Sequence, residues 1–124
     1  MNELEEIANE VYNTLGAGHN KYIYQRAIEI ELMLRNVPYS EKITLPIFYK
    51  DFIVSWVDVD LVLGGVIVAI RTEKNIQEED VNQLERYMSL FSLHDIKAGL
   101  IINFPQKKSD ECEFRYVNNV ERNY

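Results

Sequence analysis

The chain has 124 residues, of which 47% are hydrophobic and 27% are charged. This is the composition of an ordinary folded protein, and it excludes the disordered and low-complexity classes. At roughly 100 to 200 residues per domain, the length predicts one domain over residues 1–124. A formal net charge of −7 disfavours sequence-independent binding to nucleic acid or to an anionic membrane. We therefore expect no membrane contact, and only weak contact with nucleic acid through a local basic patch.

The apolar segments and the cysteine content both favour the inside of a cell. No apolar run approaches the ~18 residues of a membrane span, and the N-terminal segment lacks the basic-then-apolar plan of a signal peptide. The single Cys112 cannot form an internal disulfide. We expect an intracellular protein, in the cytoplasm, the nucleus or a viral particle, and not a secreted one.

Two helices are predicted in the first third of the chain. Apolar residues recur at helical spacing from Leu4 to Leu15 and stop at Gly16–Gly18, a glycine-rich terminator. A second helix begins directly afterwards, with His19 or Asn20 as its N-cap, and stops before Pro38. The stripe of this second helix that we expect to be buried consists of Ile23, Ala27, Ile30 and Leu34.

From Ile43 the pattern has a period of two, which predicts three consecutive strands. The first strand, Ile43–Tyr49, contains Pro46 and is expected at the sheet edge, because proline cannot donate to a ladder. The next two, Phe52–Leu63 and Val66–Arg71, flank a Gly-Gly pair suited to a two-residue hairpin turn. We expect these two strands at the centre of the sheet.

A third helix and two more strands complete the predicted elements. The helix covers Glu78–Ser92, a continuous apolar strand covers Ala98–Phe104, and a short strand covers Phe114–Val117. The apolar face of the helix consists of Val81, Leu84, Met88 and Phe91. This order predicts an α/β fold with a mixed central sheet of four to five strands flanked by helices.

The Gly-Gly turn determines which residues should face each other across the central hairpin. Counting outwards places Asp60 opposite Ala69 and Asp58 opposite Arg71. Two interpretations stay open: a cross-strand ion pair between Asp58 and Arg71, or a divalent-cation site built on Asp58 and Asp60. Alternation places Trp56, Asp58, Asp60, Ala69, Arg71 and Glu73 on one face, and Val57, Val59, Leu61, Val68 and Ile70 on the other.

Short motifs follow one another in a specific order from the first helix to residues 117–119. They are Leu15–Gly18 followed by Tyr24, Ala27 and Glu31-Leu32; Leu45-Pro46; Asp60–Val62; Gln83 with Tyr87; and Gly99–Phe104. In this order they resemble the GxxExxY family of the PD-(D/E)XK nuclease superfamily. The resemblance implies a restriction-endonuclease-like fold, in which Gln83 and Tyr87 either face the active groove or close the edge of the core.

The resemblance also implies metal-assisted phosphodiester hydrolysis, in which a strand Asp and a strand Glu hold Mg²⁺, a Lys orients the water and a helix Glu assists. This sequence keeps the Asp as Asp60, but it has Ala69 at the Glu position, Arg71 at the Lys position and Lys21 at the helix Glu position. Alanine offers no oxygen to a cation, and a guanidinium stays charged near neutral pH. Arg71 can lie across Asp58 and Asp60 and replace the charge of a metal. We therefore expect a degenerate site without catalytic residues, metal or cofactor.

Three functional hypotheses follow. The first is a catalytically inactive nuclease-fold protein that acts as a structural or nucleic-acid-associated binding component. The second is an active Mg²⁺- or Mn²⁺-dependent nuclease in which Asp58, Glu73 and Glu31 rebuild the ligand set around Asp60. The simpler interpretation of Glu73 is a solvated loop residue. The third is a plain oligomeric interaction module without nucleic-acid contact.

The aromatic content favours self-association. Several aromatic residues have no place in the predicted buried stripes, and we expect some of them at the interface of a homodimer. The resemblance extends to proteins of bacteria and large DNA viruses, so a role in a virion is also open. The aromatic residues in question are Tyr22, Tyr39, Phe48, Tyr49, Trp56 and Tyr116.

Overall fold

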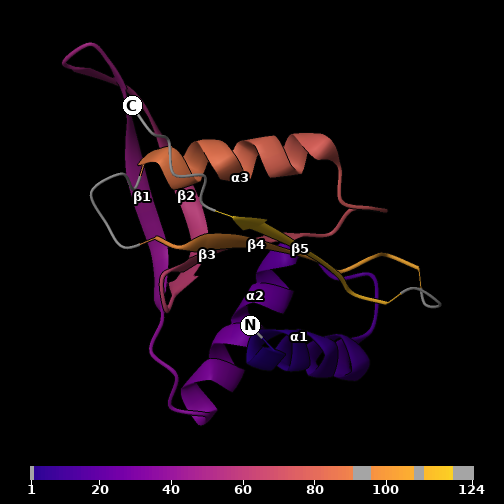
Figure 1. Ribbon diagram of the computed structural model, residues 1–124. Helices are drawn as coiled ribbons and strands as arrows, with labels where there is room; N and C mark the ends of the chain where they lie inside the picture. Colours follow the sequence, from indigo (N-terminus) through magenta and orange to yellow (C-terminus); the bar gives the residue numbers. More distant parts are fainter. Residues whose placement is uncertain (1, 91–95, 108–110, 119–124) are drawn as a thin grey trace.

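A computed structural model describes residues 2–90, 96–107 and 111–118, and it contains the predicted helices and strands in the predicted order (Figure 1). The predicted end of the third helix, with Phe91 and Ser92, lies outside the described residues. No helix in the described ranges is both long and apolar enough to cross a membrane. The elements are α1 Asn2–Leu15, α2 Lys21–Leu34, β1 Ser40–Tyr49, β2 Phe52–Leu63, β3 Val66–Arg71, α3 Glu78–Leu90, β4 Ala98–Asn103 and β5 Glu113–Asn118.

The five strands form one mixed sheet in the order β1-β2-β3-β4-β5. β1, β2 and β3 are antiparallel neighbours, β3 and β4 are parallel, and β5 returns antiparallel to β4. Helix α3 lies in the connection between the parallel strands β3 and β4, where a crossover is required. The predicted α/β class and the edge position of β1 are thus confirmed, and the central strand is β3.

Helices cover the sheet on both faces, so it has two cores (Figure 1). Helices α1 and α2 pack on one face against a cluster that includes Leu61, Val68 and Leu100. Helix α3 packs on the other face against Ile67, Ile101 and their neighbours. Gly99 of β4 permits this close approach, because a Cβ there would lie 2.7 Å from Cδ2 of Leu84.

Asn20 caps α2 as predicted, but the buried stripe of this helix lies one residue away from the predicted one. The Asn20 side chain accepts hydrogen bonds from the amides of Tyr22 and Ile23. The ring of Tyr24 stacks on Phe104 at a centroid distance of 4.3 Å, which turns the Tyr24 stripe toward the core. The buried residues are Tyr24, Gln25, Ile28, Glu29 and Leu32, whereas Ile23, Ile30 and Leu34 are 42%, 38% and 67% exposed.

The two hairpin strands β2 and β3 separate sooner than residue counting predicts. Both glycines of the turn, Gly64 and Gly65, have positive φ as predicted, but the pairing covers only Leu61–Leu63 against Val66–Val68. On the N-terminal side of Asp60, β2 pairs with β1 alone, and the two strands form a projecting hairpin (Figure 1). The side-chain alternation also shifts at this point, so Val59 joins the core under α3 while Leu61 faces α1 and α2. The expectation that Val59 and Leu61 share a face was therefore wrong.

Candidate functional site

A cleft of about 490 Å³ opens where β2 and β3 separate. It brings together the predicted site residues from four elements, with the exception of Glu31. Glu31 lies elsewhere on α2 and forms an ion pair with Arg35 at 3.7 Å. The predicted residues that line the cleft are Lys21 of α2, Asp58 and Asp60 of β2, Ala69 and Arg71 of β3, Glu73, and Gln83 and Tyr87 of α3.

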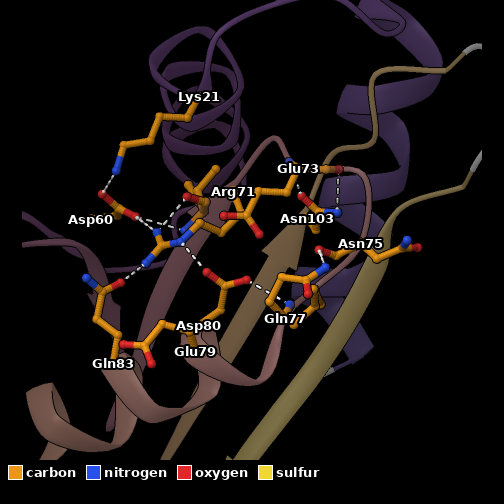
Figure 2. A network of polar contacts seen from close by, with 12 residues as sticks. Lys21, Asp60, Arg71, Glu73, Asn75, Gln77, Glu79, Asp80, Gln83 and Asn103 are labelled. Carbon is orange, nitrogen blue, oxygen red and sulfur yellow. Dashed lines mark hydrogen bonds and ion pairs between the residues drawn. The ribbon is translucent and has the colours of Figure 1, made fainter.

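Asp60 is the centre of this site, and both of its carboxylate oxygens have partners. Oδ1 lies 2.8 Å from Nζ of Lys21, and Oδ2 accepts the backbone N–H of Ile70 at 2.8 Å. Oδ2 also lies 3.8 Å from Nη1 of Arg71. Because β2 leaves β3 at this residue, the Asp60 side chain supplies the acceptor that a continued ladder would have given to Ile70. Figure 2 shows Lys21 and Arg71 both directed at this carboxylate.

Arg71 is held by partners from β2 and α3, and its side chain is only 18% exposed. Besides Asp60, its Nε lies 3.4 Å from Oδ1 of Asp80, and its Nη2 donates to Oε1 of Gln83 (Figure 2). Asp58 instead accepts a hydrogen bond from Oγ1 of Thr44 at 3.0 Å. The expected pairing of Arg71 with Asp58 was therefore wrong, because the strands separate before these residues face each other. The guanidinium lies between Asp60 and Asp80.

Glu73 and Asp80 form a pair of acids beside Arg71. Burial and then the neighbouring Asp80 raise the pKa of Glu73 to about 7. Burial alone would raise the pKa of Asp80 as well, but the Glu73 carboxyl, the Gln77 amide and Arg71 together lower it below its ordinary value. The backbone of Glu73 is fixed by two hydrogen bonds with the Asn103 side chain, at 2.8 and 2.9 Å. Glu73 is thus partly buried, which corrects its interpretation as a solvated loop residue.

Three residues near the site were not singled out from the sequence: Asp80, Gln25 and Glu29. Asp80 also accepts the Gln77 amide at 2.9 Å in the first turn of α3, where an acidic residue is a helix-start signal. Gln25 donates to the carbonyl of Asp60 at 3.0 Å and to Glu29 at 3.3 Å. Burial, followed by the Glu41 side chain, raises the pKa of Glu29. The spacing of Lys21, Gln25 and Glu29, four residues apart along one helix face, is the signal that could have revealed Gln25 and Glu29.

The donor set of this cleft does not fit the Mg²⁺ that the resemblance implies. Such a cation needs several oxygen ligands, but the oxygens of Asp60 already contact Lys21, Arg71 and the Ile70 amide. Ala69 has no side-chain oxygen to add. Within the described ranges, no group of three or more His, Cys, Asp or Glu side chains is arranged to hold a metal ion.

Comparison with known proteins gives the family of this fold and nothing narrower. No curated protein matches the chain, and no solved structure does. The family model for the PD-(D/E)XK nuclease superfamily matches residues 1–115. The match includes every residue that lines the cleft and the elements that position them, from α1 into β5. The chain therefore belongs to the PD-(D/E)XK nuclease superfamily.

Proposed function

We propose that this chain is a PD-(D/E)XK protein that no longer hydrolyses phosphodiesters and acts by binding. The observation that carries the proposal is the position of two protein cations on Asp60: Lys21 at 2.8 Å and Arg71 at 3.8 Å. They supply the positive charge that a metal ion would otherwise bring to this carboxylate. Within the superfamily, we place the chain in the GxxExxY family on the order of its motifs.

The cleft also lacks the groups that would activate water and stabilise the transition state. Hydrolysis requires positive charge directed at the oxygens of the reacting phosphate. The Lys21 ammonium is paired with Asp60, and the Arg71 guanidinium is shared among Asp60, Asp80 and Gln83. Both cations are thus already paired with protein groups. Glu73, with its pKa raised to about 7, is a proton acceptor without a neighbouring cation that is free to hold a phosphate.

The charge of the cleft favours a protein partner over nucleic acid. Five carboxyl groups line it, from Asp58, Asp60, Glu73, Glu79 and Asp80, against the two cations of Lys21 and Arg71. A phosphate backbone is repelled by such a surface. We therefore propose a structural or interaction component that works inside the cell as a homodimer. A nucleic acid, if it binds, does so outside the cleft.

Incubation of the purified protein with plasmid, linear and single-stranded DNA and with RNA, each with Mg²⁺ or Mn²⁺, tests the loss of hydrolysis. We expect no cleavage in any combination. Cleavage that disappears in Asp60→Asn would overturn the proposal and favour the active alternative built on Asp58 and Glu73. A gel-shift series from low to high salt separates the remaining hypotheses, because non-specific phosphate contacts are strongest at low salt.

A gain-of-function variant tests the same reasoning from the opposite direction. The triple variant combines Lys21→Glu, Ala69→Glu and Arg71→Lys. It restores the acids and the lysine at the three positions where this sequence departs from the family pattern. We expect this variant to gain a Mn²⁺-dependent increase in melting temperature that the unmodified chain lacks, because ligand binding to the folded state stabilises it. Adding Asp60→Asn to the variant is the matched control and should abolish the increase. An equal response of the unmodified chain to Mn²⁺ would contradict the proposal.

A further inference from the structure

The outer part of the β1–β2 hairpin is a two-stranded ribbon without a covering layer. Strand β2 pairs with β3 only at Leu61–Leu63, so residues 52–59 have β1 as their sole strand neighbour among the described residues. Figure 1 shows this hairpin extending away from the rest of the sheet. Its exposed large apolar residues are Phe48 (58%), Tyr49 (62%), Phe52 (73%), Ile53 (47%), Val54 (61%) and Trp56 (58%). We call these six residues the arm surface.

Such a ribbon is expected to be stabilised by a partner that covers its apolar side chains. An isolated two-stranded hairpin is at best marginally stable in water, and it needs a third strand or a packed apolar layer. At roughly 200 Å² per aromatic side chain, the four aromatic residues of the arm surface alone expose about 500 Å². The register divides this area between the two faces of the ribbon, with Tyr49 and Phe52 on one face and Phe48 and Trp56 on the other. A partner that contacts both faces would therefore cover more than half of the ~800 Å² that each partner contributes to a standard interface.

The charge of the arm favours a second copy of this chain. Residues 43–57 contain only two charged residues, Lys50 and Asp51, which are adjacent and opposite in sign. Two arms can therefore approach without repulsion, although the whole chain has a net charge of −7. The same net charge opposes approach to an anionic membrane or to nucleic acid.

We propose that two copies of the chain associate through the arm surface, with side chains of one arm packed against those of the other. Pro46 leaves the outer edge of β1 without one backbone donor, which disfavours association by strand addition at that edge. In a two-fold dimer the same patch meets itself, so Phe52 and Trp56 contribute from both copies. This inference rests on the dimer in the proposed function and names its interface, but it does not depend on the loss of hydrolysis.

Sedimentation equilibrium of the full chain, together with the fluorescence of its single tryptophan, tests the interface. We expect dissociation to monomers on dilution, with Trp56 emission shifting to longer wavelength as monomers form. Phe52→Gln should raise the dimer dissociation constant at least about 30-fold, the effect of removing an interface hot spot, and should move the emission change to correspondingly higher protein concentrations. Circular dichroism should show that the variant is folded, because Phe52 is exposed in the monomer.

The matched control is Leu34→Gln, since Leu34 is 67% exposed on α2 and lies outside the arm. It should leave the dissociation constant unchanged. A monomer at all accessible concentrations, or a dimer weakened by Leu34→Gln and not by Phe52→Gln, would overturn the inference. So would a monomer whose Trp56 emission shifts only with neutral phosphatidylcholine vesicles, which would indicate a lipid-binding arm. Failure here is distinguishable from failure of the proposed loss of hydrolysis, which is measured by cleavage.

Discussion

Replacing Asp60 should destabilise the fold, although the residue lines a cleft. In Asp60→Ala the Ile70 N–H loses its acceptor at 2.8 Å, and an unsatisfied buried donor costs about 1 to 3 kcal/mol. The ion pair with Lys21, whose side chains are 30% and 11% exposed, adds at most about 1 kcal/mol because solvent screens it. We expect a loss of about 3 kcal/mol in the free energy of unfolding for Asp60→Ala. Asp60→Asn should lose about 1 kcal/mol, since its amide oxygen still accepts from Ile70.

Urea unfolding in the presence of a chelator measures both losses. With a slope of roughly 1.5 kcal/mol per molar urea, Asp60→Ala should lower the midpoint by about 2 M and Asp60→Asn by less than about 1 M. Asp58→Ala is the matched control, because Asp58 is exposed and, among the described residues, accepts a hydrogen bond only from Thr44, at 3.0 Å. Its loss should stay within about 0.5 kcal/mol.

The sign of the change is what decides between a structural aspartate and a metal ligand. A carboxylate held among other acids for a metal ion is repelled by them when no ion is bound, so its removal stabilises the metal-free protein. If Asp60→Asn were as stable as the unmodified chain or more stable, the conclusion that Lys21 and Arg71 compensate the negative charge of Asp60 would be refuted.

Three further predictions concern groups around the site and the core. Because the pKa of Glu73 is raised from 4.5 to about 7, the folded chain holds a proton that the unfolded chain releases, and stability falls as the pH rises through that window. Glu73→Gln should remove this pH-dependent loss of stability, which is on the order of 1 to 2 kcal/mol after solvent screening. Urea unfolding at pH 5 and pH 8 measures the loss in both proteins, and an equal pH dependence of the two would contradict the prediction. Gly99→Ala should cost about 1 to 3 kcal/mol, measured as a lower melting temperature, because the new Cβ would lie 2.7 Å from Leu84; an unchanged melting temperature would show that α3 shifts without cost. Burial and Glu111 raise the pKa of Cys112 to about 12, so maleimide should label it slowly at pH 8 and rapidly after unfolding, whereas rapid labelling of the folded chain would show that the thiol is accessible and ionised.

Features set by neighbouring residues could be predicted from the sequence. The Gly64-Gly65 turn and the Asn20 cap each depend on a few adjacent residues, and both have the expected geometry. Most of the named site residues could also be placed, since all but Glu31 line the cleft, although Asp80 lines it as well and was not predicted. Their locations follow from the strand order and from the family resemblance.

The partners within the cleft could not be predicted, because they depend on how the elements are placed in space. Counting along the hairpin assumes that β2 and β3 stay paired, but they separate at Asp60, so Arg71 meets Asp80 and Gln83 instead of Asp58. Helix α2 carries two apolar stripes that overlap in sequence. The buried stripe is the one that carries Tyr24, whose ring stacks on Phe104, a residue far away in the sequence.

The early separation of β2 from β3 gives one aspartate a structural role in the sheet. By accepting the Ile70 N–H, Asp60 closes a gap in the bonding of the sheet whether or not any reaction takes place beside it. Its presence in a sequence therefore says little about turnover, and the residues at 69 and 71 are better indicators. Exchanging such an aspartate for alanine, the common way to silence a nuclease, would here weaken the scaffold, so a null phenotype would not by itself report on catalysis.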